Sequence, residues 1–192
     1  MIRAIALPLL CGAALAVAGC TGDTPSAEEP EPAVETAAGE PAGTSASRAE
    51  SGVVATVNDG DTITLRDGRK VRLVQIDAPE LYDECYGRRA RTEAARLTPP
   101  GTAVTLQRDP KLDDRDRHGR LLRYVEAGGR NVNGELVARG AAVPYFFRGE
   151  RGRHAEDLLL AVEEAREQRA GMWAACPHAR LNTGIGSQTG PA

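Results

Sequence analysis

Two short stretches of the sequence place acidic side chains where predicted β-strands begin and end. In NDGDT, Asp61 opens a strand, a position where acidic residues are disfavoured, whereas the turn alone explains Asp59. In RLVQIDAPE, Pro79 removes a backbone donor and ends the strand, which leaves Asp77 and Glu80 on a stiff loop. Together, Asp61 and Asp77 would supply hard oxygen ligands, which suit Ca²⁺ or Mg²⁺ better than Zn²⁺.

Two arginines complete a set of side chains that could hydrolyse a phosphodiester bond. Arg72 lies on the strand that ends at Asp77, and Arg120 begins a strand after DRDRHG. A metal ion held by carboxylates would polarise a phosphate, the guanidinium groups would bind its oxygens, and the free carboxylate of Glu80 would direct water. Each residue alone also fits a turn or a solvent-facing position, so it is the combination that indicates chemistry.

The pattern of apolar residues predicts strands first and helices afterwards. Five or so short strands followed by helices are typical of a mainly β protein, and here they predict an OB-fold five-stranded β-barrel with about three α-helices. The expected strands are 52–57, 62–66, 70–76, 103–108 and 120–127, and the expected helices are 87–97, 131–140 and 154–171. This barrel must position the carboxylates and arginines.

The N-terminal fifty residues differ from the rest in composition. Residues 1–19 have the basic start and apolar run of a signal peptide, and the ending VAGC resembles a bacterial lipobox, in which Cys20 becomes the lipidated N-terminus. An ordinary signal peptide with a chance cysteine is the alternative. Residues 20–50 are rich in Pro, Ala and Glu, so a disordered tether is expected. A domain over 51–180 and a disordered tail over 181–192 complete the expected organisation.

Charge and histidine content exclude some classes of partner and metal site. Residues 21–50 carry a net charge of −6, and residues 51–192 carry +2, so the charge does not indicate a broad basic surface for binding nucleic acid. Three histidines, none of them beside another histidine or a cysteine pair, make a zinc site improbable. Any nucleic-acid binding must therefore come from a local site.

Four motifs follow one another in the order and at the approximate spacing of one known family. They are VNDGDTITL, RLVQIDAPE, DRDRHGRLLRYV and NVNGELVARGAAVPY, followed by a final helix and Trp173. Through them the sequence resembles the staphylococcal (micrococcal) nuclease, or thermonuclease, family over about residues 53–176. The resemblance implies an OB-type five-stranded barrel with three helices, in agreement with the apolar pattern.

The same resemblance implies roles for individual residues. The implied Ca²⁺ ligands are the carboxylates of Asp61 and Asp77 and the backbone carbonyl of Ala78, and the implied catalytic residues are Arg72, Glu80 and Arg120. Tyr145 matches an aromatic residue that contacts the nucleotide, for which stacking is physically reasonable. His118 stands where the type enzyme has a phosphate-contacting tyrosine, and Arg117 where it has a basic neighbour, so both are expected to contact substrate.

Two cysteines remain in the domain once the N-terminal ones are assigned. Cys11 leaves with the signal peptide and Cys20 receives lipid, so Cys85 and Cys176 have only each other. An exported domain meets oxidising conditions, so a disulfide between them is expected. Two separate thiols are the alternative, and the family resemblance favours neither.

The sequence therefore predicts a Ca²⁺-dependent nuclease, lipid-anchored on the outer side of the cell membrane. By resemblance it would hydrolyse DNA and/or RNA by in-line attack of water and leave 3′-phosphates. A monomer is expected, with no protein partner implied. The alternative is a non-catalytic surface OB module that binds oligonucleotides, although binding alone does not require three acids beside a polyanion.

Overall fold

Five strands form a closed barrel in the structure, a computed structural model that describes residues 50–192. The barrel strands are β1 (Glu50–Val57), β2 (Thr62–Leu65), β3 (Lys70–Leu73), β5 (Ala103–Gln107) and β6 (Leu121–Ala127). Four of the pairings are antiparallel, and a parallel pairing of β3 with β6 closes the ring. The predicted five-stranded OB-type barrel is confirmed.

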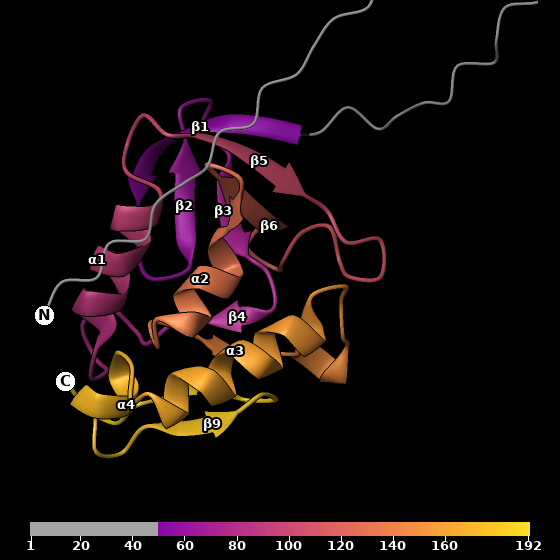
Figure 1. Cartoon of the computed structure of the whole chain (residues 1–192). Helices are drawn as coiled ribbons and strands as arrows, with labels where there is room; N and C mark the ends of the chain where they lie inside the picture. The colour runs from indigo at the N-terminus through magenta and orange to yellow at the C-terminus, as the bar shows by residue number, and fades with distance from the viewer. Residues whose placement is uncertain (1–49) are drawn as a thin grey trace, which may run out of the picture. The chain divides into compact units, whose positions relative to one another are not determined.

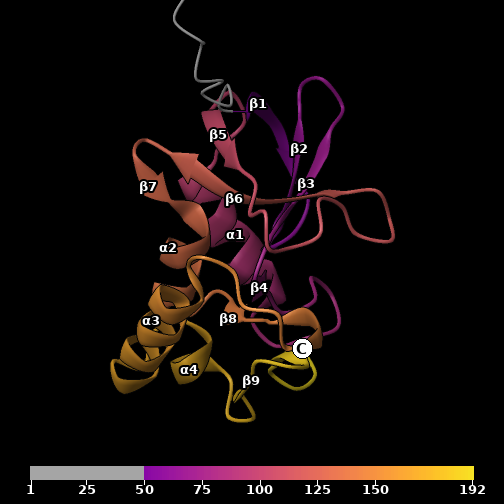
Figure 2. The ribbon, with the colours of Figure 1, turned by 90° about the vertical axis from the view of Figure 1, so that its right-hand side faces the viewer.

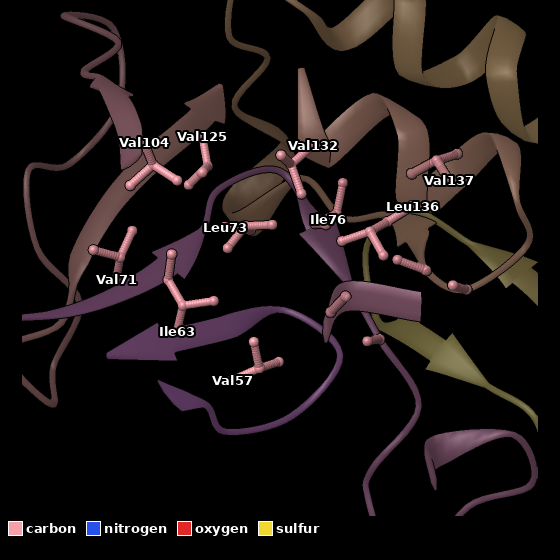
Figure 3. Packing of buried hydrophobic residues seen from close by; sticks show 14 of the residues in the cluster. Val57, Ile63, Val71, Leu73, Ile76, Val104, Val125, Val132, Leu136 and Val137 are labelled. Atoms are coloured by element: carbon pink, nitrogen blue, oxygen red, sulfur yellow. The ribbon is translucent and has the colours of Figure 1, made fainter. Parts of the chain in front are cut away.

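Alternating side chains fill the barrel, as the apolar pattern requires. Figure 3 shows Ile63, Val71, Leu73, Val104 and Val125 converging from four of its strands, and each is at most 3% exposed. Because successive residues of a strand point to opposite faces, their polar neighbours are left on the outside of the barrel. The rigid frame that results can hold side chains at its rim in fixed positions.

Three helices cover one end of the barrel (Figure 1). They are α1 (Gly87–Leu97), α2 (Val132–Ala138) and α3 (Ala155–Glu167), and a short α4 (Met172–Ala175) follows. Helix α2 packs against both β6 and α3 and contributes Val132, Leu136 and Val137 to the core. Within residues 50–192, no helix combines the length and the apolar character needed to cross a bilayer.

The strand predicted over 70–76 is interrupted. β3 ends at Leu73, Gln75 takes a left-handed conformation with a φ of 64°, and Ile76–Asp77 forms a separate strand, β4. β4 pairs with β8 (Val143–Pro144) instead of continuing along the barrel. The buried Gln75 side chain receives a hydrogen bond from the amide of Gly152 and donates one to the carbonyl of Glu150, contacts that no local pattern reveals.

The expected disordered tail over 181–192 is wrong. Strands β9 (Arg180–Asn182) and β10 (Gly186–Gln188) form a hairpin, and β10 lies beside β4 and β8. Figure 2 shows β9 below β8, at the end of the domain away from the barrel. The expected helix over 154–171 is also shorter, because it ends at Glu167. Arg169 (φ 52°) and Gly171 (φ 54°) have positive φ angles, which a right-handed helix cannot contain. The remaining short elements are β7 (Arg130–Asn131) and a 3₁₀ turn over Phe147–Gly149. The expected signal peptide, Cys20 and tether up to residue 49 lie outside the described residues.

Candidate active site

One cleft of about 1160 Å³ lies at the rim of the barrel, where β3, β4 and the loop before β6 meet. All nine residues that the sequence indicated for metal, catalysis or substrate line this cleft: Asp61, Arg72, Asp77, Ala78, Glu80, Arg117, His118, Arg120 and Tyr145. They come from five separate segments of the chain. The fold therefore brings together residues that are up to 84 positions apart in the sequence, from Asp61 to Tyr145.

Arg72 lies at the centre of the acidic residues. Its Nη1 is 3.0 Å from Asp61 Oδ2, and its Nη2 is 2.7 Å from Asp77 Oδ1. Nη1 also donates to the carbonyl of Ile76 at 2.8 Å. Although burial opposes ionisation, the charges of Asp61 and Asp77 raise the pKa of Arg72, so the guanidinium is a fixed positive charge. This planar group is held from several sides and can present only a defined edge to the cleft.

Asp61 is buried, with 7% of its surface exposed, and the charges of Asp59 and Asp77 act on it as well as that of Arg72. Its Oδ2 accepts a hydrogen bond of 2.8 Å from the amide of Ala78, which ties the start of β2 to the loop after β4. Burial raises the pKa of Asp61 to about 7, and the nearby charges of Asp59 and Asp77 act in the same direction. A bound cation would relieve this repulsion.

Arg120 is oriented by two hydrogen bonds that it donates, one to its own loop and one to β2. Its Nε donates to Asp116 Oδ2 at 2.6 Å, and its Nη1 donates to Thr62 Oγ1 at 3.2 Å. Thr62 in turn donates to Asp61 Oδ1, so the second arginine is linked to the acidic group by one hydroxyl. Burial alone would raise the pKa of Asp116, but the hydrogen bonds from Arg120 lower it, so this carboxylate stays ionised as the anchor of the arginine.

Glu80 differs from Asp61 and Asp77 because its side chain is exposed at the cleft. Within residues 50–192 its carboxylate forms no hydrogen bond or ion pair, while its amide is held by Glu84 Oε2 at 2.7 Å. Partial desolvation and the charges of Asp77, Asp59 and Glu84 raise its pKa. A carboxylate with a raised pKa and free oxygens can accept a proton from water or orient it.

The outer part of the cleft combines basic and aromatic side chains. Arg117 and His118 are exposed neighbours, with Arg117 Nε 3.0 Å from His118 Nε2, and the Tyr145 ring lies 6.5 Å from that of Phe147. Phe147 is 51% exposed and Arg148 stacks on it at 4.9 Å, and neither residue was predicted to belong to the site. Three consecutive aromatic residues, Tyr145, Phe146 and Phe147, could have indicated them. Side chains alternate between the two faces of a strand, so the three cannot all lie on its buried face.

A preformed metal cage is not part of the described protein. No three histidine, cysteine, aspartate or glutamate side chains of residues 50–192 converge as a cation site. The arrangement instead offers two carboxylates, Asp61 and Asp77, and the carbonyl of Ala78, which accepts no hydrogen bond from the described residues. Of the roughly four acceptor positions on a carboxylate, Arg72 and the Ser187 amide use two on Asp77, so two remain open.

Comparison with known proteins gives the family that the four sequence motifs resemble. The family model described as "Staphylococcal nuclease homologue" matches residues 70–175. An uncharacterized endonuclease of Escherichia coli O157:H7 is 41% identical over 128 residues, covering 64% of this chain and 76% of the relative. A micrococcal nuclease of Shigella flexneri is 34% identical over 134 residues (64% and 72%), and a thermonuclease of Staphylococcus intermedius is 31% identical over 135 residues (66% and 77%).

The OB-type barrel, its cleft and these relatives define a nuclease, a hydrolase whose substrate is nucleic acid. The chain belongs to the staphylococcal nuclease family.

The pH dependence of stability should report the buried acid. In chelator, the free energy of unfolding is expected to fall as the pH rises from about 4 to 8. The pKa of Asp61 is about 7 in the folded protein against 3.8 ordinarily, so the folded state binds more protons in this window and loses stability as they leave. The loss is on the order of 3–4 kcal/mol.

Urea unfolding followed by Trp173 fluorescence at pH 4 and pH 8 measures this loss. The Asp61→Asn variant should show a much flatter dependence, because it removes the titrating group while keeping an acceptor for the Ala78 amide. The pKa of Glu80 is raised as well, so Glu80 titrates in the same direction, but both proteins contain it and the difference between them reports Asp61. Parallel curves for the two proteins would contradict the assignment.

Proposed function

We propose that this protein is a Ca²⁺-dependent nuclease that hydrolyses phosphodiester bonds of DNA and/or RNA outside the cytoplasm. The observation that carries the proposal is the convergence of Asp61, Asp77, Arg72, Arg120 and Glu80 on one cleft. A protein that only bound a polyanion would gain nothing from buried acids at the binding surface, since they repel phosphate.

The acidic residues fit a calcium ion. Asp61, Asp77 and the carbonyl of Ala78 would hold it, and these hard oxygens are the donors that Ca²⁺ prefers. The charges present support this fit, because the single guanidinium of Arg72 lies between two carboxylates, 3.0 Å from Asp61 and 2.7 Å from Asp77. When bound, the ion would supply electrostatic polarisation of a phosphate oxygen.

The chain's own residues account for the remaining steps. Arg72 and Arg120 bind the equatorial phosphate oxygens and take up the charge that develops on them, each from a position fixed by carboxylates. Glu80 orients the attacking water and accepts its proton. Its raised pKa makes it a stronger base than an ordinary glutamate. Tyr145 stacks on a base, and Arg117 and His118 contact neighbouring phosphates.

The test is to incubate the purified protein with plasmid DNA and with RNA, in calcium or in chelator. Calcium-dependent loss of polymer and products carrying 3′-phosphates are the expected results. The 3′-phosphates can be detected because a polymerase extends such ends only after phosphatase treatment. Nucleic acid that is retained by the protein but stays intact would instead identify a binding module.

The location of the protein depends on Cys20, for which we propose lipidation after cleavage of residues 1–19. Two acyl chains on one residue should hold the protein durably on a membrane. Cys20→Ser is therefore expected to abolish membrane retention, leaving uncleaved precursor or a soluble form. Fractionation of cells with metabolic labelling by a clickable fatty acid measures both effects. A processed Cys20→Ser protein that still sediments with membranes would contradict lipid anchoring.

A further inference from the structure

The C-terminal hairpin reaches the acidic group of the cleft. The backbone amide of Ser187, on β10, donates a hydrogen bond of 2.8 Å to Asp77 Oδ2. The preceding residue, Gly186, has a φ of 99°, and a Cβ added there would overlap the same carboxylate oxygen. The hairpin can therefore approach Asp77 this closely only because position 186 is a glycine.

The Asp77 carboxylate is consequently held by two separate segments of the protein, β3 and β10. Arg72 binds Oδ1, and the Ser187 amide binds Oδ2, so neither oxygen can rotate without breaking a charge-assisted hydrogen bond. The position opposite Ser187 on β9 is Leu181. Since the Ser187 amide points to Asp77, it is not one of the bonds that hold the hairpin together.

The C-terminal segment over residues 176–192 is attached at both ends to one short segment that follows Glu80. At its start, Cys176 is joined to Cys85 by a disulfide. At its end, the amide of Cys85 donates to the carbonyl of Gly190 at 2.9 Å, and the amide of Ala192 donates to that of Asp83 at 3.2 Å. The hairpin between these anchors has little freedom to move away from the cleft.

The hairpin also holds the aromatic side of the cleft. The amide of Phe146 donates to the carbonyl of Thr183 at 2.7 Å, in the segment between Tyr145 and Phe147. The turn itself is closed by Asn182, whose side chain accepts from the amides of Gly184 and Ile185. A rigid turn thus contacts the acidic side and the aromatic side of the cleft together.

We propose that the hairpin over residues 180–188 is a positioning element of the active site, and that the Ser187 amide fixes the Asp77 carboxylate in the orientation that cation binding requires. This inference rests on the proposed function, because it assigns Asp77 to calcium. Ser187 acts through Asp77 and touches neither the phosphate nor the attacking water.

The experiment compares Ser187→Pro with Ser187→Ala in the full chain. Proline removes the amide hydrogen that binds Asp77 but no ladder bond of the hairpin, whereas alanine keeps the amide and removes only the hydroxyl. Gly186→Ala is the second variant, since its new Cβ pushes the hairpin tip off the carboxylate. Gly184→Ala is the matched control, because a Cβ there would make only an ordinary contact, 3.6 Å from Asn182 Oδ1.

Three quantities are measured for each protein: the calcium Kd by calorimetry without nucleic acid, kcat and KM on DNA, and the unfolding midpoint in chelator. Ser187→Pro and Gly186→Ala should raise the calcium Kd about tenfold or more, the loss expected for one hydrogen bond to a charged group, and lower kcat at limiting calcium with KM for DNA unchanged. Ser187→Ala and Gly184→Ala should match the wild type.

A calcium Kd within twofold of the wild type in Ser187→Pro would overturn the inference. If that variant does not fold, the same criterion applied to Gly186→Ala decides. A wild-type protein that binds no calcium would instead refute the proposed function, so the two failures are distinguishable.

Discussion

Replacing Arg120 with lysine is expected to lower kcat on DNA by at least ~10²-fold, the usual loss when one preorganised electrostatic donor is removed. Arg120 uses Nε to bind Asp116 and Nη1 to bind Thr62, and this leaves the rest of the guanidinium for a phosphate. A lysine ammonium is a single point charge, so it cannot keep the anchor at Asp116 and hold two phosphate oxygens at the same time.

Steady-state kinetics on a defined oligonucleotide measures the loss, with Arg166→Lys as the matched control. Arg166 is half-exposed on α3 and pairs with Glu163, away from the cleft. Losses of similar size are expected for Arg72→Lys and Glu80→Gln, with unfolding measured for Arg72→Lys because that residue also joins two carboxylates. Wild-type turnover in Arg120→Lys would exclude Arg120 from catalysis.

Replacing both Cys85 and Cys176 with alanine is expected to lower the free energy of unfolding by up to about 4–5 kcal/mol. The disulfide joins residues 91 positions apart, so its removal frees a long loop in the unfolded chain. Cys176 is buried beside Val143 and Met172, and truncating it adds a small packing loss. Urea denaturation of the oxidised wild type and of the double variant gives the difference.

Reduced wild-type protein is the control for this measurement, because it keeps both sulfur atoms in place. It should unfold at a urea concentration close to that of the double variant. A thiol count on the denatured, unreduced protein should give no free thiol in the domain. Two free thiols, or equal stability of the oxidised and reduced proteins, would exclude the bridge.

Local patterns were sufficient for the barrel and for most of the site. The helix expected over 87–97 has those bounds in the structure, and the barrel strands lie within two residues of their expected ends apart from the strand that Gln75 interrupts. Asp61 was singled out because an acid at the start of a strand needs a reason, and the structure buries it against Arg72. Such signals are readable because they depend on residue type and on neighbours in the sequence.

What the sequence did not reveal depends on contacts between distant segments. The left-handed Gln75 is stabilised by the loop that contains Gly152, 77 residues later, and no propensity of glutamine indicates this conformation. A disordered tail is expected over 181–192, yet Asp77, Cys85 and Phe146 hold it in place. Composition reports how a segment behaves alone, whereas these segments are ordered by partners elsewhere.

The parallel pairing of β3 with β6 has a consequence for when activity can arise. Arg72 lies on β3 and pairs with Leu122, two residues beyond Arg120, so the pairing that closes the barrel also brings the two arginines together. Proteins rich in contacts between segments distant in the sequence fold slowly, because loop-closure entropy is lost before those contacts form. A newly made chain is therefore harmless to nucleic acid until this closure. For a nuclease that we propose is exported, the delay would protect the genome and transcripts of the cell that makes it.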